Sequence, residues 1–288
     1  MDRQGRADAV DQEMAVRLLP EEALTALGRW WAKNEPTYPD GTPGAHAVVY
    51  VPARWASIAP WPAGLAPASH AGDARVSRAE VTGMVADALR REAFTEALVA
   101  TYVWGKGKSG TPGGSGPSTL QKILAAENLD AALAASVTAL REQGAKEAYM
   151  VLHKAVPEFG PSFFTKFLYF AGQALHAVPG LQPLILDRVL SLSLRPLAAA
   201  VGRETGLDPD GTVAAWVWAE WDWTSHRYGV YLSFMHAAAR QIASTEAWPS
   251  DATPDLLECA LFSGPGPRPG RAQASREAEA ARGRPPAH

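Results

Sequence analysis

Apolar residues recur at helical spacing along most of the chain, whereas the strict alternation typical of strands is rare. Ser77 and Glu80 form a capping-box pattern, which predicts a helix over 77–91, and a second helical pattern follows over 92–104. Only residues 47–51 have the composition of a short strand. We therefore expect an all-α protein with roughly eight to eleven helices.

The other helices are predicted from the same periodicity together with start and stop signals. Asp208, which is followed by Pro209, and either Thr224 or Ser225 are expected N-caps. The remaining predicted helices cover residues 20–33, 118–126, 129–143, 146–155, 162–173, 185–195, 209–221 and 225–242. Residues 1–12 are polar, and we expect them to be loose.

Three regions are expected from the composition along the chain. Residues 1–74 form an N-terminal helix and an extension rich in proline and tryptophan, and residues 75–263 form the helical domain. Residues 264–288 contain proline, glycine, arginine, alanine and glutamate without an aliphatic anchor, which predicts a disordered tail. A Gly/Ser/Lys-rich loop is expected over 105–116.

The overall charge argues against a strongly basic nucleic-acid binder, since the net charge is −3 at pH 7. Cys259 is the only cysteine, which excludes an internal disulfide and a cluster held by four thiolates. The chain begins with polar residues, and no apolar run reaches the length of a membrane span. We expect a cytoplasmic protein that does not contact a membrane.

The most informative stretch covers residues 156–170, in which a Pro/Gly turn separates two helical patterns. This arrangement predicts a helix-hairpin-helix over 145–173, and such a hairpin directs backbone N–H groups toward a phosphate. Asp187 lies between apolar runs 27 positions after Gly160. It is a candidate catalytic carboxylate, and a helix N-cap is the alternative and compatible role.

Together these segments resemble the helix-hairpin-helix DNA glycosylases, and most of all the bacterial OGG-fold group related to 8-oxoguanine glycosylase. In that family a hairpin of the form Leu-Pro-Gly-x-Gly opens a helix, and an Asp follows roughly two dozen residues later. Gly160 matches the second hairpin glycine, and Asp187 matches the Asp. The resemblance implies two helical halves around a cleft, with DNA or a modified nucleobase as the partner and no cofactor.

Two departures from the family pattern affect the expected chemistry. Glu158 stands in place of the first hairpin glycine, where an anion opposes the DNA backbone. Ser162 stands where bifunctional members carry a catalytic lysine, and Lys166 follows one helical turn later on the same face. Two mechanisms stay open: an amine mechanism through Lys166, and hydrolysis by water through Asp187, which Ser162 favours. An exposed surface lysine is the alternative role of Lys166.

Other candidate site residues come from the hairpin, from the loop after residue 104 and from the aromatic residues. The expected DNA contacts are Phe159, Gly160, Ser162, Lys154, Lys106 and Lys108, and Lys122 is a further candidate for a phosphate contact. The expected base pocket consists of Trp104, Phe163 and Tyr231. The aromatic residues of 216–234 could stack on an extruded base, although such residues more often belong to the core.

No metal site is expected, because His153, His226 and His236 lack the spacing of zinc ligands. The leading hypothesis is a DNA-base glycosylase that cleaves the N-glycosidic bond of a modified or oxidised purine, in a repair or bacterial defence setting. A non-catalytic nucleobase- or DNA-binding protein derived from a glycosylase is the alternative, which Glu158 and Ser162 favour. Protein partners are not indicated by any motif.

Overall fold

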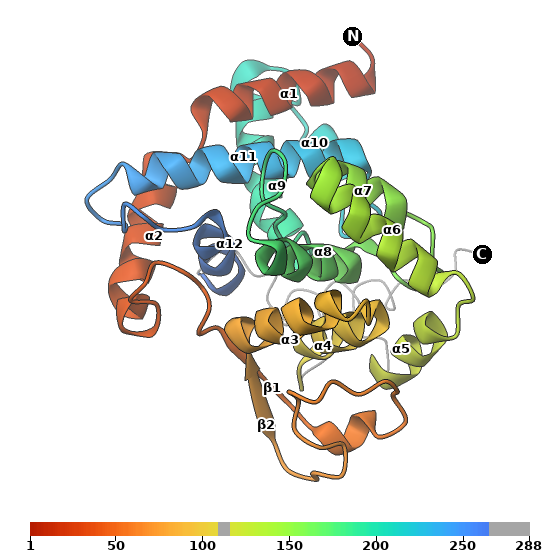
Figure 1. Ribbon diagram of the computed structural model, residues 1–288. Helices are drawn as coiled ribbons and strands as arrows, with labels where there is room; N and C mark the ends of the chain where they lie inside the picture. Colours follow the sequence, from red (N-terminus) through yellow and green to blue (C-terminus); the bar gives the residue numbers. More distant parts are fainter. Residues whose placement is uncertain (109–115, 265–288) are drawn as a thin grey trace, which may run out of the picture.

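The computed structural model describes residues 1–108 and 116–264 (Figure 1). Within these residues it contains twelve α-helices and one two-stranded antiparallel sheet, which confirms the all-α expectation. The expected tail after residue 264 and most of the expected loop over 105–116 lie outside the described residues.

The helices begin and end close to the predicted positions in most cases. In chain order they are α1 Arg3–Arg17, α2 Glu21–Asn34, α3 Arg78–Arg90, α4 Phe94–Lys106, α5 Gly116–Leu124, α6 Leu129–Glu142, α7 Ala145–Leu152, α8 Pro161–Leu175, α9 Arg188–Thr205, α10 Thr212–Val217, α11 Ser225–Ala243 and α12 Pro254–Ser263. The strands are β1 Ala47–Tyr50 and β2 Ala74–Ser77, and two 3-10 turns cover Glu35–Thr37 and Pro52–Trp55.

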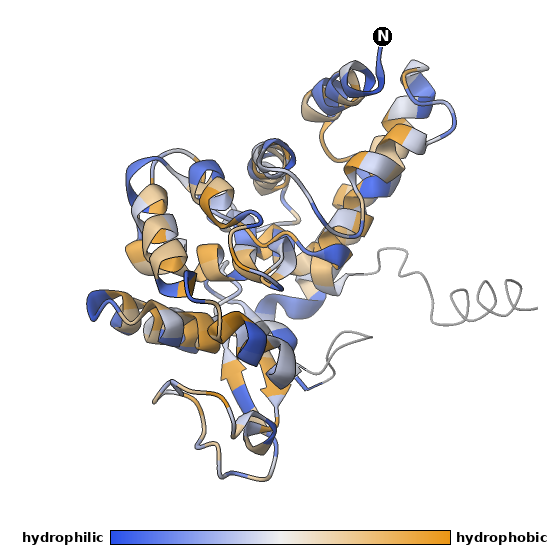
Figure 2. Cartoon of the chain, turned by 90° about the vertical axis from the view of Figure 1, so that its right-hand side faces the viewer, coloured by the Kyte–Doolittle hydropathy of each residue, from blue (hydrophilic) through white to orange (hydrophobic). Residues whose placement is uncertain are grey.

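Helix α8 is the centre of the molecule. Its residues 164–172 are all buried, so that no side of this part of the helix faces solvent. A helix that is apolar on every side must be surrounded, and α8 contacts α3, α4, α6 and α7. In Figure 1 it lies between the α3–α4 pair and α11, with α1 on the far side of α11. Figure 2 shows the hydrophobic residues concentrated where these helices meet.

Two predicted helix starts are confirmed by their hydrogen bonds. The Ser77 side chain accepts from the Glu80 backbone N–H, and the Glu80 carboxylate accepts from the Ser77 N–H, which completes the capping box of α3. Thr224 caps α11 by accepting from the Arg227 N–H. Asp208 is not the N-cap that was expected, because α10 begins later, after Gly211. Its carboxylate instead accepts from the N–H groups of residues 213 and 214.

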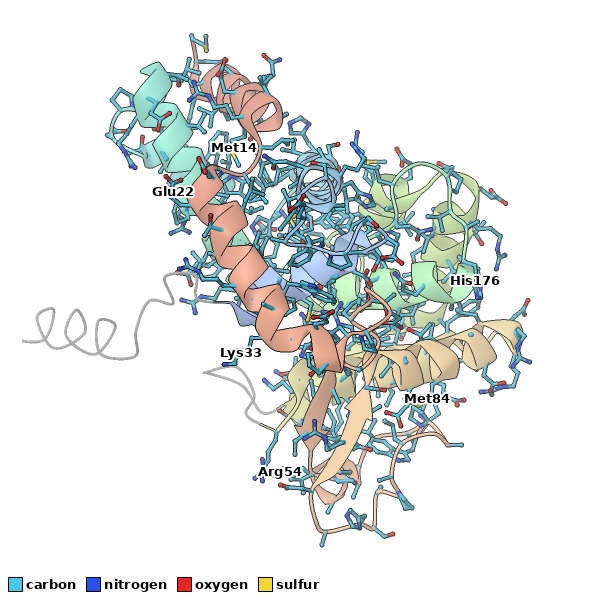
Figure 3. All side chains as sticks on the ribbon, turned by 90° about the vertical axis from the view of Figure 1, so that its left-hand side faces the viewer. Met14, Glu22, Lys33, Arg54, Met84 and His176 are labelled. Atoms are coloured by element: carbon cyan, nitrogen blue, oxygen red, sulfur yellow. The ribbon has the colours of Figure 1, made fainter. Side chains whose placement is uncertain are left out.

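The expectation that residues 1–12 are loose is wrong, because they form most of α1. Asp2 caps this helix by accepting from the Gly5 N–H. Ala7, Val10 and Met14 form a narrow buried stripe, and Met14 is labelled in Figure 3. The stripe is only one residue wide at each turn. Polar residues therefore dominate the composition of α1, although the helix packs on the core.

Helix α9 also differs from the prediction, because it continues through Pro196 to Thr205. A proline inside a helix removes one backbone hydrogen bond and normally ends or kinks the helix. Here Leu190, Leu194 and Ala198 form a buried row at four-residue spacing, and this packing keeps the helix continuous. Gly206, with φ +71°, then ends it in the left-handed conformation.

The proline- and tryptophan-rich extension folds back on α3. Strands β1 and β2 pair in the register Ala47↔Ser77, and the sheet projects from the α3–α4 end of the molecule (Figure 1). Met84 of α3 faces this extension (Figure 3), since its Cγ lies 2.7 Å from the position of a Cβ added at Gly64. Trp55 is buried in the same region.

None of the described helices is by itself long and apolar enough to cross a membrane. Only α5 and α6 taken together pass by length and composition, and they are bent by 87° where they meet.

Candidate active site

The turn between α7 and α8 covers residues 153–160 and is longer than expected, since α7 ends at Leu152. Glu158 has a left-handed backbone, with φ +63°, a region that favours glycine. The position of the first hairpin glycine therefore keeps a glycine-like conformation although it carries a glutamate. The Glu158 carboxylate is exposed and lies 3.8 Å from Lys122 Nζ, which partly offsets its charge.

The start of α8 is open to solvent. Gly160 is the N-cap with an extended backbone, and no heavy atom lies within 4 Å of the position that a side chain would take. A phosphate oxygen could therefore approach the first N–H groups of the helix at this point. Ser162 is half-buried in the first turn, whereas Phe159 is buried against Phe164. The core therefore holds the Phe159 side chain, and the expected DNA contact of this residue stays a prediction that concerns its backbone.

Lys166 is buried on the central helix, with 9% of its side chain exposed. Its Nζ donates to the Ser162 carbonyl at 2.7 Å and to Asp187 Oδ2 at 3.2 Å. Side chains on a helix lean toward its N-terminus, so that Nζ reaches back one turn to the level of Ser162. The amine thus lies beside the residue that matches the lysine position of the family pattern.

Asp187 is the N-cap of α9, and 12% of its side chain is exposed. Its Oδ1 accepts from the N–H groups of Val189 and Leu190 at 3.0 and 3.2 Å, while Oδ2 faces Lys166. One oxygen of the carboxylate therefore caps the helix, and the other is left to face Lys166.

The extended segment before Asp187 lies close along α8. A Cβ at Gly172 would fall 2.4 Å from Pro183 Cγ, so that only glycine permits this approach. Closer to Asp187, the Leu186 N–H donates to Thr165 Oγ1 at 3.2 Å, and Thr165 donates back to the Leu186 carbonyl at 3.1 Å. These contacts place Asp187 opposite Lys166.

The same segment is held from its other side by three buried side chains. The hydroxyls of Tyr228 and Tyr231 donate to the carbonyls of Leu184 and Ile185, at 2.9 and 2.5 Å. The Ile185 N–H donates to the buried Glu258 carboxylate at 2.6 Å. We expected Tyr231 to line the base pocket, but it is fully buried. It fixes the backbone near the site and does not border an open pocket.

Small and aromatic residues surround Lys166. A Cβ at Gly105 would lie 2.5 Å from Lys166 Cδ, so that a glycine at this position of α4 makes room for the lysine. The Phe163 ring lies 5.7 Å from Nζ and stacks on Tyr102 at 4.2 Å. Phe163 is half-buried, and it is the expected base-pocket residue that borders the pair. Trp104 is buried instead, with its ring against Phe170.

A buried polar cluster that the sequence did not indicate supports this region. Arg78 pairs with Glu258 at 2.9 Å, and its Nε donates to His46 Nδ1 at 3.3 Å. Burial raises the pKa of Glu258 to about 7 although the Arg78 charge opposes this, and burial together with the Arg78 charge lowers the pKa of His46 to about 4. Arg78 follows a capping serine, a position typical of exposed residues, so no local pattern could reveal its burial.

Most of the lysines expected to contact phosphates have a carboxylate partner in the structure. Lys108 pairs with Asp73 at 2.8 Å, and Lys154 lies 3.5 Å from Asp222. Burial lowers the pKa of Lys106. Exposed pairs of this kind contribute only about 0–1 kcal/mol, so a DNA phosphate can replace the carboxylate partner.

The aromatic residues of 216–234 divide into buried and exposed groups. Trp218, Trp223 and Tyr228 are buried, whereas Trp221 is 70% exposed. Trp216 is 40% exposed and lies under the Arg3 guanidinium. Most of these residues therefore belong to the core, and Trp221 is the residue presented to solvent.

Trp221 lies on a loop between the start of α9 and the hairpin turn, and its neighbours contact both. On one side Arg188, the residue after Asp187, donates to Glu220 at 2.6 Å. On the other side Asp222 lies 3.6 Å from His153 and close to Lys154 in the hairpin turn. The residues on each side of Trp221 are thus paired, while its own indole is exposed, and an exposed indole is suited to stacking on a partner.

A hairpin turn, a central helix with a buried lysine and a helix capped by the opposing carboxylate define a helix-hairpin-helix glycosylase-like protein. The family described as "putative 8-oxoguanine DNA glycosylase OGG-like protein" matches residues 41–262, and the chain belongs to this family. The matched region includes Lys166 and Asp187 and begins after α1 and α2. No curated protein and no solved structure matches the chain.

Substitution of Gly105 by alanine should displace Lys166 from Asp187, because the added Cβ would lie 2.5 Å from Lys166 Cδ. We expect a loss of about 1–3 kcal/mol in the free energy of unfolding, measured with urea. Gly83→Ala on the exposed face of α3 is the matched control, since no atom lies within 4 Å of its added Cβ. The control should be neutral or stabilising by about 0.5–1 kcal/mol, and equal effects of the two substitutions would contradict the assignment.

The contribution of His46 to the stability of the protein should fall as the pH decreases from 6.5 toward 4. The unfolded chain takes up a proton on His46 that the folded chain refuses, because the folded pKa is lowered from 6.5 to about 4. The cost reaches roughly 3 kcal/mol near the lower limit. Glu258 acts in the opposite direction, because its pKa is raised to about 7 in the folded protein, so the comparison with a variant isolates His46. His46→Asn keeps an acceptor for Arg78 and does not titrate, so the unfolding free energy of the wild type should fall relative to that of the variant over this range. Parallel pH profiles of the two proteins in urea unfolding would refute the role of His46.

Proposed function

We propose that the protein is a DNA glycosylase that removes a modified or oxidised purine, with Lys166 as the amine nucleophile and Asp187 as its partner. The observation that supports this proposal is the buried contact of 3.2 Å between Lys166 Nζ and Asp187 Oδ2, on the helix that follows the hairpin. Family membership supports DNA as the partner and a glycosylase-like activity.

The geometry favours the amine mechanism over hydrolysis by water. From the sequence, Ser162 in the lysine position favoured the water mechanism. The Lys166 amine, however, reaches the Ser162 carbonyl at 2.7 Å and so occupies the region where the matching lysine would be expected. A lysine buried beside a carboxylate is also a costly arrangement that an exposed surface lysine does not require.

The chemistry follows from the two groups. Asp187 Oδ2 is in position to accept a proton from Nζ, whose lone pair then attacks C1′ of the nucleoside. The electron pair of the N-glycosidic bond leaves with the base, which takes up the proton that Asp187 accepted, so that the carboxylate is charged again. The carboxylate then stabilises the positive charge at C1′. The bond from C1′ to the ring oxygen breaks next, the ring oxygen takes up a second proton from the amine nitrogen, and a protonated imine forms between Lys166 and the opened sugar.

Access to the pair is narrow, since each side chain keeps only about a tenth of its area exposed. A base inside a duplex cannot reach such a position, so the target nucleotide must leave the stack before it reacts. The half-buried Phe163 ring borders Lys166 and is placed to move as the nucleotide enters. We expect the hairpin start at Gly160 and the exposed Trp221 to contact the duplex around the extruded nucleotide.

Borohydride should trap a covalent complex between the wild-type protein and DNA that contains the lesion, at the sugar from which the base has been removed. An oligonucleotide panel with oxidised and alkylated purines would identify the substrate, and alkali would reveal abasic sites. Lys166→Gln should abolish trapping, because the amide cannot form the imine but can still donate to Asp187. Asp187→Asn should reduce excision by orders of magnitude and keep the fold, since asparagine is an equally good N-cap.

Lys33→Gln is the matched control for trapping, because this lysine is exposed on α2, precedes the matched region and is not among the expected DNA contacts. The control should be trapped like the wild type. Excision without trapping would indicate hydrolysis by water through Asp187. Lesion binding without any excision would favour the non-catalytic alternative, which the carboxylate partners of the surface lysines support.

Two kinds of DNA contact should separate by their salt dependence. Trp221→Ala should weaken DNA binding by about 1–3 kcal/mol without a change in the salt slope, because stacking carries no charge. Lys154→Ala should lower the slope of log K against log salt by about 0.9, since it removes one phosphate contact. Trp216→Ala is the control for the indole, as its ring is covered by Arg3. Unchanged affinity of Trp221→Ala in fluorescence titrations would exclude the stacking role.

A further inference from the structure

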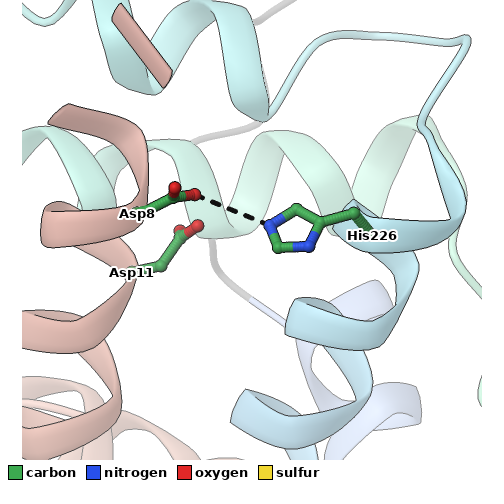
Figure 4. Close-up of side chains that lie close together, drawn as sticks. All are labelled: Asp8, Asp11 and His226. Atoms are coloured by element: carbon green, nitrogen blue, oxygen red, sulfur yellow. Dashed lines mark ion pairs between the residues drawn. The ribbon is translucent and has the colours of Figure 1, made fainter. Parts of the chain in front are cut away.

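Helices α1 and α11 bring together three side chains that are far apart in the sequence. Asp8, Asp11 and His226 each direct a potential metal ligand into one place, and these ligand atoms all lie within 4.8 Å of one another (Figure 4). Asp8 Oδ1 and His226 Nε2 are 3.6 Å apart. No metal site was expected from the spacing of the histidines, because the two carboxylates come from the other end of the chain.

The separations are close to those of a coordinated ion. Zinc binds imidazole nitrogen and carboxylate oxygen at about 2.0–2.2 Å, which places neighbouring ligands of a tetrahedral site roughly 3.3–3.6 Å apart. The distance between Asp8 and His226 already meets this requirement. Asp8 is half-buried and His226 exposed, so that small rotations of their side chains can bring the remaining ligand atoms into range.

A second observation indicates that a ligand is needed here. The Asp11 side chain is only 9% exposed, and its Oδ1 accepts from Arg227 at 2.7 Å. Its other oxygen, Oδ2, is buried and has no hydrogen-bond partner. A buried carboxylate oxygen without a partner is costly, and a bound cation would satisfy it.

The cavity around the cluster also contains a buried polar group without a hydrogen-bond partner. It has a volume of about 570 Å³ between α1 and α11, and it is lined by all three candidate ligands and by Trp218. Trp218 is fully buried, and its indole N–H has no acceptor. An oxygen ligand that completes the shell of an ion could accept this hydrogen bond. The cavity does not include Lys166 or Asp187.

The positive groups near the cluster do not neutralise both of its carboxylates. Arg227 is held between Asp11 Oδ1 and the Trp218 ring, where its guanidinium lies 5.0 Å from the ring centre. Lys146 also lines the cavity but is exposed on α7. Two carboxylates therefore face one guanidinium at the cluster, and the Asp8 charge is not consumed by Arg227.

We propose that Asp8, Asp11 and His226 bind a divalent first-row transition metal ion of the zinc type, with solvent as the further ligand. One imidazole and two carboxylates suit such an ion, whereas magnesium and calcium prefer oxygen ligands alone. The ion fastens α1 to α11. Asp8 and Asp11 lie on α1, which precedes the region matched by the family, whereas His226 lies within that region. The inference does not rest on the proposed glycosylase activity.

The test uses the full chain, freed of metal with a chelator and titrated with Zn²⁺ by calorimetry. We expect one Zn²⁺ per chain, a higher Tm with zinc, and slower proteolytic release of α1. Asp8→Asn and His226→Gln should each weaken binding by more than about tenfold, because even the loss of a group that only supports a ligand costs about that much. His153→Gln is the matched control, since His153 also faces an aspartate but lies outside the cluster.

Two results would overturn the inference. One is the absence of heat and of any change in Tm at millimolar Zn²⁺. The other is zinc binding whose affinity is the same in Asp8→Asn, His226→Gln and wild-type protein, which would mean adventitious binding elsewhere on the surface. Both variants affect partly exposed side chains, and far-UV circular dichroism will establish that they fold.

Discussion

The burial of one lysine in the central helix is the constraint on which the rest of the structure depends. Helix α8 is buried on every side over residues 164–172, and Lys166 lies within this largely apolar stretch. An ammonium in such surroundings is tolerated only if a carboxylate and further acceptors meet it. Asp187 and the Ser162 carbonyl supply them. The position of α9, and with it much of the second half of the molecule, follows from this requirement.

The carboxylate is kept in place by a second layer of buried polar groups. Glu258 of α12 accepts from the backbone two residues before Asp187, and Arg78 of α3 compensates the Glu258 charge. Helices from both sides of α8 thus converge on the backbone that presents Asp187. The Ile185 N–H and one Glu258 oxygen, and the other Glu258 oxygen and Arg78, are paired in this layer. Such pairing limits the movement of the backbone before Asp187, which the proposed catalytic role of the Lys166–Asp187 pair requires.

The surface that we propose to contact DNA has the opposite character. Its charges are exposed and paired with nearby carboxylates, and Glu158 is tied to Lys122. These pairs are weak and can exchange with phosphate. The protein therefore combines a buried interior pair with a surface whose charges can change partners, and the proposed function needs both.

The sequence by itself determined most of the helices and the hairpin, because capping and turn formation depend on residues within a few positions of one another. It also indicated Asp187 and Lys166 through a recognisable spacing. It did not indicate α1 or α12. Only the tertiary structure decided that these two side chains meet, that Arg78 is buried, and that Asp8 and Asp11 lie beside His226. Burial and contact between distant residues depend on how helices pack around α8, and no local pattern of polarity encodes that packing.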